Sequence, residues 1–301
     1  MSTVIITGCS TGFGNLAARR LAGLGHEVFA TMRAPDGRNR PAADELRAGP
    51  DASRLRVVDL DVTSLESVDA AAALVLDGAG PPDVIVNNAG QMFVGLAELF
   101  TPEEFTRQLD VNVVGVHRVC RAFLPAMRQR GSGLIINISS IAGRMALPFF
   151  AVYHASKWAL EGYSLGLRRE LASSGVDLVV VEPGPFTTEL FPQSPRPVDA
   201  DGRGASYPES AHQTFDDMGK SFEELFEDPD TPTDPALVVD RMIELIDMQP
   251  GTRPFRSAVG VDFGVTERNA ADESRDEALL ETMGLEAFAT LHAGGVASET
   301  Q

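Results

Sequence analysis

Short apolar runs alternate along the chain with segments in which apolar residues recur every three or four positions. The runs predict strands at residues 3–7, 27–31, 55–58, 84–87, 134–139, 177–181 and 253–259. The recurring spacing predicts helices at residues 13–24, 65–76, 102–130, 151–173 and 235–248, with a weaker one near 274–283. Apolar strands joined by helices indicate an α/β fold, a doubly wound, Rossmann-like parallel sheet with strand order 3-2-1-4-5-6.

One stretch, residues 186–235, interrupts this alternation with proline, glycine and acidic residues. Long irregular stretches inside compact domains are usually lids or disordered loops. We therefore expect one catalytic domain over residues 1–265, with a substrate lid at about 186–234. A C-terminal helical extension and polar tail are expected over residues 266–301.

The composition is that of a soluble globular protein, since 44% of the 301 residues are hydrophobic and 23% are charged. A formal net charge of -18 repels nucleic acid and anionic lipid, so neither is an expected partner. The two cysteines give no disulfide framework, and no Cys or His spacing suggests a metal site. Without a signal-peptide pattern or an apolar run of about 18 residues, we expect a cytoplasmic protein that does not enter a membrane.

A glycine-rich turn connects the first predicted strand to the first predicted helix. Its residues expected to contact a dinucleotide are Gly8, Ser10, Thr11, Gly12, Phe13 and Gly14. Glycine lets the backbone approach a pyrophosphate, and the helix N-terminus offers free N–H groups. The spacing is G-x-x-x-G-x-G rather than G-x-G-x-x-G, and a plain tight turn is the alternative interpretation. The position at a strand-to-helix junction favours nucleotide binding.

The end of the second predicted strand distinguishes between the two nicotinamide cofactors. An NAD enzyme places an acidic residue there to bind the ribose 2′-hydroxyl, whereas this chain has Thr31-Met32-Arg33. A guanidinium can bind a 2′-phosphate through charge-assisted hydrogen bonds, so Arg33 predicts NADP(H). Asp36 lies nearby, but its Pro-Asp-Gly context is typical of a turn.

Three side chains form a candidate catalytic group. Tyr153 and Lys157 are four residues apart on a predicted helix and therefore share one face. A nearby cation favours the phenolate, so Lys157 is expected to lower the tyrosine pKa toward a range useful for acid–base catalysis. Ser140 follows the fifth predicted strand, at the sheet edge where such folds bind ligands, and can hold the substrate oxygen.

These residues belong to a set of motifs by which the chain resembles the short-chain dehydrogenase/reductases. The motifs, in chain order, are TGCSTGFG (7–14), DLDVT (59–63), NNAG (87–90), LDVNVVG around Asn112, NISS ending at Ser140, YHASK (153–157) and PGPFTT (183–188). The resemblance covers residues 1 to about 190. It is closest to the 17β-hydroxysteroid and retinol dehydrogenase-like group, which often carries an ATxR end to the second strand.

The resemblance implies roles for particular positions. Asn112, Ser140, Tyr153 and Lys157 match the family's catalytic tetrad. The matched cofactor-binding positions are Asp61 and Val62 at the adenine, Asn88, Ala89 and Gly90 near the ribose, Tyr153 and Lys157, and Pro183, Gly184, Phe186 and Thr188 near the nicotinamide carboxamide. The family's pairing through helices like those at 102–130 and 151–173 implies a homodimer or homotetramer.

The expected activity is hydride transfer between NADP(H) and a carbonyl or alcohol carbon of a bulky, largely apolar small molecule. The expected substrate walls are Met92, Phe93, Met145, Phe149, Phe150 and Phe191, although the aromatic residues could equally belong to the core. Two alternatives remain. One is a sugar-nucleotide epimerase or dehydratase, with which the glycine spacing disagrees. The other is an NADP(H)-binding sensor or scaffold without turnover.

Overall fold

Seven parallel strands form the centre of the molecule in a computed structural model that describes residues 1–291. The strands are β1 (Thr3–Ile6), β2 (Glu27–Met32), β3 (Leu55–Asp59), β4 (Val84–Asn87), β5 (Gly133–Ile138), β6 (Val176–Pro183) and β7 (Arg256–Val259). They are ordered β3-β2-β1-β4-β5-β6-β7. The predicted doubly wound sheet and its strand order are therefore confirmed, and β7 extends the sheet beyond β6.

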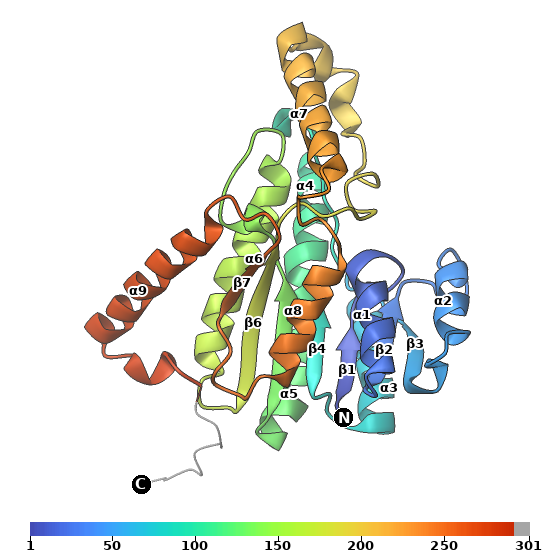
Figure 1. Ribbon diagram of the computed structural model, residues 1–301, viewed down its shortest axis with the longest axis vertical. Helices are drawn as coiled ribbons and strands as arrows, with labels where there is room; N and C mark the ends of the chain where they lie inside the picture. Colours follow the sequence, from blue (N-terminus) through green and yellow to red (C-terminus); the bar gives the residue numbers. More distant parts are fainter. Residues whose placement is uncertain (292–301) are drawn as a thin grey trace.

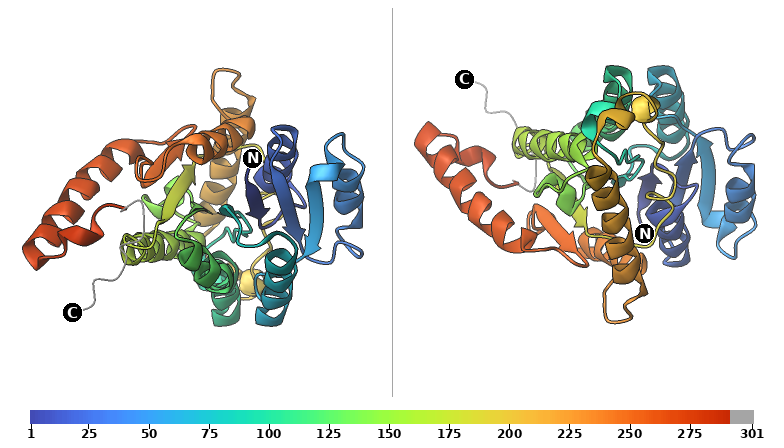
Figure 2. Two further views of the ribbon diagram at one scale, coloured as in Figure 1. Left: turned by 90° about the horizontal axis from the view of Figure 1, so that it is seen from below. Right: turned by 90° about the horizontal axis from the view of Figure 1, so that it is seen from above.

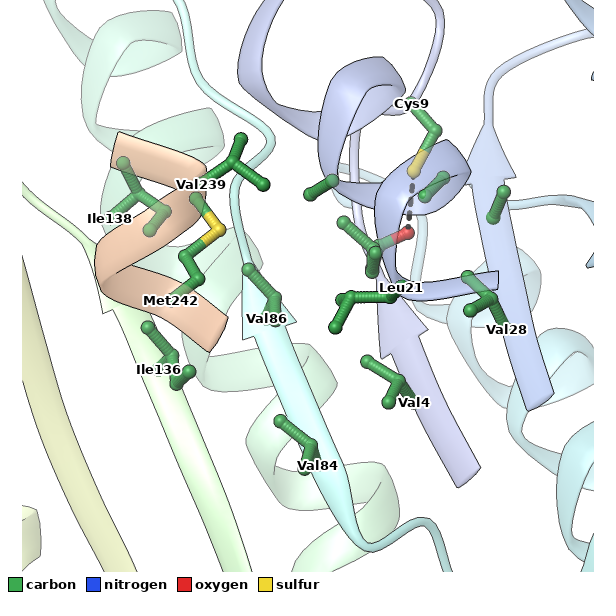
Figure 3. Packing of buried hydrophobic residues seen from close by; sticks show 14 of the residues in the cluster. Val4, Cys9, Leu21, Val28, Val84, Val86, Ile136, Ile138, Val239 and Met242 are labelled. Carbon is green, nitrogen blue, oxygen red and sulfur yellow. Dashed lines mark hydrogen bonds between the residues drawn. The ribbon is translucent and has the colours of Figure 1, made fainter. Parts of the chain in front are cut away.

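Helices cover both faces of the sheet (Figure 1). One face carries α1 (Gly12–Gly23), α2 (Arg40–Arg47) and α8 (Ala236–Asp247), and the other carries α3 (Leu65–Ala79), α4 (Pro102–Leu109), α5 (Gly115–Arg130) and α6 (Ala151–Glu170). Alternate strand residues enter two cores because successive strand side chains point to opposite faces. Val4 packs under α1 and α8, where Figure 3 shows it beside Leu21, while Ile5 packs under α3 and α5.

The helix predicted over residues 102–130 is interrupted. Between α4 and α5 the backbone makes a π-helical turn, Asp110–Val114, which contains Asn112. The apolar periodicity continues through this turn, so the pattern alone did not reveal it. Single π-helical turns inside α-helices occur frequently at functional sites.

The stretch expected to be an irregular lid contains a long helix. After several short turns, α7 (Glu209–Glu227) extends beyond the carboxyl ends of the strands (Figure 1). Its apolar side chains recur at helical spacing, as Phe215, Met218 and Phe222, and all three pack against residues near Tyr153. The helix was missed because prolines and acidic residues dominate the surrounding sequence.

The C-terminal part contains α9 (Val265–Met283), which begins nine residues before the predicted helix. Figure 2 shows α9 at the β7 edge, pointing away from the rest of the molecule. Its first turns are attached to the sheet, because Val265 and Asn269 are buried. The end of the predicted polar tail, residues 292–301, lies outside the described residues.

Candidate active site

A cavity of about 520 Å³ lies at the carboxyl ends of the strands. Its walls come from the turn after β1 and from the segments that follow β2, β4, β5 and β6, together with α6 and α7. Nearly all the residues expected to bind the cofactor line it: Gly8, Ser10, Thr11, Gly12, Phe13, Arg33, Asp61, Val62, Asn88, Ala89, Gly90, Tyr153, Lys157, Pro183, Gly184, Phe186 and Thr188. The cavity therefore combines the glycine turn with the candidate catalytic group.

Two glycines allow the turn after β1 to fold so tightly. Gly8 has φ +74°, and a Cβ there would lie 2.8 Å from the Cα of Ala89. Gly14 does not line the cavity, and a Cβ on it would lie 2.4 Å from the Gly8 carbonyl oxygen. The side chain of Thr11, the residue before α1, makes no capping hydrogen bond, so the helix N-terminus faces the cavity with free N–H groups. This cradle fits a pyrophosphate.

The segment after β4 is fastened to this turn by side-chain hydrogen bonds. Thr7 Oγ1 accepts hydrogen bonds from the backbone N–H groups of Asn88 (3.0 Å) and Ala89 (2.9 Å). The Asn88 amide donates in return to the carbonyl oxygens of Thr7 (2.9 Å) and Gly8 (3.0 Å). These reciprocal bonds fix the two cofactor-facing segments relative to each other.

Two exposed guanidiniums, Arg33 and Arg38, lie at the end of the cavity next to β2. Within residues 1–291 no ion pair involves either of them, although most arginines of this acidic chain have a carboxylate partner. Asp36 does not line the cavity, and its carboxylate pairs with Arg47 at 3.3 Å. Asn39 donates a 2.6 Å hydrogen bond to the Arg33 carbonyl oxygen and thereby shapes this loop. The end of the cavity is therefore positively charged and suits an anion.

The catalytic candidates converge at the centre of the cavity. Ser140 lies two residues after β5, directly before the 3-10 turn Ile141–Gly143. Its Oγ accepts a hydrogen bond from the Ala142 N–H (3.1 Å) and donates one to the Pro183 carbonyl oxygen (3.2 Å). Tyr153 and Lys157 enter from one face of α6, and both are 6% exposed. Lys157 Nζ donates to the Ile138 carbonyl oxygen at 2.8 Å and lies 5.7 Å from the centre of the Tyr153 ring.

The tyrosine pKa shifts in the direction opposite to the one expected. Burial raises the pKa of Tyr153 to about 12, and a hydrogen bond with Ser140 only partly offsets this effect. Burial also lowers the pKa of Lys157 to about 8, against an opposing attraction from Glu161. Desolvation of both groups thus outweighs the effect of one ammonium several ångströms from the ring. In the protein chain itself, Tyr153 carries its proton at neutral pH.

Asn112 lies behind the cavity wall rather than in it. Its amide donates to the Gln91 carbonyl oxygen (2.9 Å) and to Ser156 Oγ (3.0 Å), and its Oδ1 accepts from the Gln91 N–H (2.9 Å). Ser156 Oγ in turn donates to the Tyr153 carbonyl oxygen at 2.7 Å. The π-helical turn thus connects the segment after β4 with the helix that carries the tyrosine. The place of Asn112 in the catalytic tetrad, which the family resemblance implies, stays a prediction.

The part of the cavity beyond Ser140 is apolar. Met92, Met145, Phe150 and Phe191 line it, as expected. Phe93 does not, because its ring stacks on Phe100 at 5.6 Å in a separate small cluster. Phe149 does not line it either: its backbone has φ +69°, and its ring packs edge-on against Phe215 of α7 at 5.2 Å.

Other cavity residues escaped the sequence analysis. The main ones are Arg38, His154, Phe222 and Phe226. The Phe222 ring centre lies within 6.1 Å of the ring centres of Phe150 and Phe191 and 6.4 Å from that of Phe226. The helical spacing of α7 could have indicated its two phenylalanines. The position of His154 between Tyr153 and Lys157 could have indicated that residue.

A family model described as short chain dehydrogenase matches residues 2–198. The chain belongs to the short-chain dehydrogenase/reductase family. The matched region begins at β1 and ends beyond β6, so it contains the glycine turn and all four tetrad positions. The predicted family is therefore confirmed.

Two curated relatives are similar to this short-chain dehydrogenase. A 3-ketodihydrosphingosine reductase from Bacteroides thetaiotaomicron is 39% identical over 62% of this chain and 64% of its own. Human 17-beta-hydroxysteroid dehydrogenase type 6 is 42% identical over 62% of this chain and 57% of its own. The match thus spans less than two thirds of each relative's length. The second relative confirms the predicted likeness to hydroxysteroid dehydrogenases.

Two solved structures share the fold. A short-chain dehydrogenase from Streptomyces avermitilis is 32% identical with a TM-score of 0.70, covering 94% of this chain and 98% of its own. An alcohol dehydrogenase from the archaeon Thermococcus sibiricus, complexed with 5-hydroxy-NADP, is 25% identical with a TM-score of 0.67, covering 86% of this chain and 96% of its own.

Within residues 1–291 of the present chain, no helix is both long and apolar enough to cross a bilayer. The same residues contain no group of three or more potential His, Cys, Asp or Glu metal ligands.

Proposed function

We propose that this dehydrogenase is an NADP(H)-dependent reductase of bulky, apolar ketones, and that it also catalyses the reverse oxidation of the corresponding alcohols. The observation that carries the proposal is the shared cavity, in which a protonated Tyr153 and Ser140 lie between a pyrophosphate cradle and an apolar chamber. A bound nicotinamide supplies the hydride in reduction and accepts it in oxidation. Metal chemistry is not required by this scheme.

The protein's own groups handle the substrate oxygen and its proton. When the substrate binds, the single proton of the Ser140 hydroxyl turns from the Pro183 carbonyl oxygen to the substrate carbonyl oxygen. The Tyr153 phenol donates the proton that this oxygen needs as the carbonyl is reduced. Lys157 holds its ammonium close behind the phenol and stabilises the phenolate that remains. Because the pKa of Tyr153 is raised to about 12, the phenol is protonated at neutral pH, as a general acid in reduction requires.

The preference for NADP(H) rests on Arg33 and Arg38. Both guanidiniums reach the cavity beside β2, and no carboxylate in the described part of the chain neutralises them. Guanidiniums bind phosphate through charge-assisted hydrogen bonds, whereas a ribose 2′-hydroxyl gains little from them. The bound NADP derivative in the archaeal relative is consistent with this proposal.

We expect Arg33→Asp to weaken NADPH binding by about 10- to 100-fold, because one charge-assisted hydrogen bond is lost and a repulsive charge is introduced. NADH binding should change by less than about threefold. Fluorescence titration of both cofactors measures the two affinities without any substrate. Arg40→Asp, on the exposed side of α2 and outside the cavity, is the control. An unchanged ratio of the two affinities would show that Arg33 does not contact the 2′-phosphate.

The substrate class follows from the walls beyond Ser140. Met92, Phe150, Phe191 and Phe222 present apolar surface there, and the acidic α7 covers them. Both curated relatives carry names that refer to large lipophilic molecules, a sphingoid base and a steroid. Steady-state assays with NADPH and a ketone panel of increasing size test the proposal. Turnover of small charged ketones alone would contradict it.

We also propose a homodimer or homotetramer. The helices α4 to α6 expose Phe105, Val114 and Trp158, each between 37% and 40% accessible. Large apolar side chains exposed on adjacent helices are typical of association surfaces. Sedimentation of the purified protein gives its mass in solution.

A further inference from the structure

The loop between Ser140 and α6 forms one wall of the substrate chamber. Ala142, Met145 and Leu147 of this loop line the cavity, so its position determines the space available above Ser140. The loop contains a short 3-10 turn, Ile141–Gly143, and then an extended stretch without regular structure. Something other than secondary structure must therefore hold residues 144–150 in place.

His154 binds both arms of this loop. It follows Tyr153 in α6 and is 7% exposed. Its Nε2 accepts a 2.8 Å hydrogen bond from the Leu147 N–H, and its Nδ1 lies 2.7 Å from the Ala142 carbonyl oxygen. A backbone N–H can only donate and a carbonyl can only accept, so Nδ1 carries the hydrogen and Nε2 is unprotonated. Both bonds exist together only when the imidazole is neutral.

We propose that His154 is a positioning residue whose neutral imidazole holds the loop at 142–147 against the substrate chamber, and that its protonation releases this loop. Only the kinetic test of this inference rests on the proposed function. A proton on Nε2 would face the Leu147 N–H, so one hydrogen bond becomes a donor–donor contact. Met145 and Leu147 would then leave the wall, while the cofactor cradle on the other side of Ser140 would stay in place.

The other loop contacts do not reach Leu147. The Met145 N–H donates to the Ile141 carbonyl oxygen (3.0 Å), and the Gly95 N–H donates to the Phe149 carbonyl oxygen (2.8 Å). Arg144 points away from the cavity, where it hydrogen-bonds to Asn269 (2.8 Å) and pairs with Asp272, both on α9. Trp158 donates only a long 3.5 Å hydrogen bond to the Met145 carbonyl oxygen. The hydrogen bond from the Leu147 N–H to the imidazole is what connects the Leu147 backbone to α6. His154 therefore controls the arm of the loop nearest to the substrate.

The surrounding titratable groups can be separated from His154. Tyr153 and Lys157 on α6 and Glu189 after β6 line the same cavity, and Arg144 lies in the loop itself. The pKa of Tyr153 is raised to about 12 and that of Lys157 lies at about 8, so both stay protonated through the acid range. Burial lowers the pKa of His154 from its ordinary value of 6.5. Its neutral form therefore prevails at neutral pH and persists below pH 6.5, and it is lost only as the pH falls through the lowered pKa.

Kinetics over pH 5–8 with three variants test the proposal. At saturating NADPH, kcat/KM of the native enzyme for a bulky ketone should fall about tenfold at acid pH, below about 6.5; the NADPH dissociation constant should change alike in the native enzyme and in His154→Gln, because the 2′-phosphate itself titrates near about pH 6. His154→Gln keeps one acceptor and one donor but cannot titrate, so its profile should be flat and its KM near the native value. His154→Phe keeps the bulk of the ring without the bonds, and its ketone KM should be about tenfold higher at every pH. Glu189→Gln, the control, should keep the native acid limb.

Hydrogen exchange of the peptide covering residues 142–148 provides a readout that needs no substrate. Protection corrected for intrinsic rates should be lower at pH 5.5 than at pH 7.5 in the native protein, and low at both in His154→Phe. An acid limb that persists in His154→Gln, or protection of the loop that does not depend on pH, would overturn the proposal. If no ketone is turned over but the exchange behaves as described, the proposed function fails and the clamp stands.

Discussion

Tyr153→Phe is expected to lose activity by about 10²- to 10⁴-fold while it binds NADPH as tightly as the native enzyme. The phenol is buried in the cavity and carries the only proton placed beside Ser140 in the proposed scheme. Phenylalanine fills the same volume, so the wall of the chamber and the fold are retained. The loss should appear in kcat rather than in the ketone KM, because the proton is transferred in the transition state and not in the bound complex.

Tyr163→Phe gives the matched control for this experiment. Tyr163 lies on the same helix, its hydroxyl lies 3.2 Å from His117 Nδ1, and it does not line the cavity. The substitution removes the same hydroxyl group from α6 and should leave turnover close to that of the native enzyme. Comparable activity of the Tyr153 and Tyr163 variants would contradict the assigned role of Tyr153.

Arg256→Met is expected to destabilise the protein by about 3–5 kcal/mol, the usual consequence of removing one partner from a buried ion pair. Arg256 on β7 lies between two buried carboxylates, with its Nε 2.9 Å from Glu161 and 3.8 Å from Glu182. Asn269 of α9 donates a 2.5 Å hydrogen bond to Glu182 from the other side. Without the guanidinium, Glu161 and Glu182 remain in the core with no cation between them. Urea unfolding followed by circular dichroism measures the change.

The pH dependence identifies the carboxylate responsible. Burial and the neighbouring Glu161 raise the pKa of Glu182 to about 8. In the folded protein, Glu182 therefore keeps a proton that the unfolded chain releases above its ordinary pKa of 4.5. The contribution of this proton to stability is complete below pH 4.5 and is lost as the pH rises through about 8. Glu182→Gln should remove that pH dependence and should partly rescue Arg256→Met at pH 8. An Arg256→Met protein as stable as the native one would show that the carboxylates do not need this cation.

The same ion pairs connect β7 with β6 and α6. Glu182 is the residue before Pro183, which contacts Ser140, and Arg256 lies on the next strand. Glu182 follows the strand predicted at residues 177–181, and the sequence gives no sign of its partner, since Arg256 is 74 positions away. The network became visible only when the fold brought β6, β7, α6 and α9 together.

Features encoded by local sequence were predictable. The apolar runs located the strands, because buried parallel strands are apolar on both faces, and the doubly wound topology then predicted their order. The glycine turn and the tyrosine–lysine pair were found because each lies within one short segment. Arg38, by contrast, reaches the cavity only through the course of the loop after β2, which Asn39 shapes by its bond to Arg33. Long-range contacts of this kind leave no periodic pattern.

The prediction that Lys157 lowers the pKa of Tyr153 was wrong for an electrostatic reason. Helical spacing correctly placed the two side chains on one face, but spacing carries no information on burial. Both groups are almost completely enclosed, and desolvation opposes the charged form of each. Likewise, Phe93 and Phe149 are apolar aromatic residues of the kind that line substrate pockets. Phe93 instead stacks on Phe100, and Phe149 packs against Phe215 of α7.

The central claim is that this cavity transfers a hydride from a nicotinamide to a ketone whose oxygen is protonated by Tyr153. The most direct measurement uses NADPH deuterated on one or the other face of its nicotinamide C4, with mass analysis of the alcohol formed. The account predicts one deuterium on the carbinol carbon from one of the two labelled cofactors and none from the other. Tight binding of both cofactors, with no deuterium found in any product of a broad panel of apolar ketones, would contradict it.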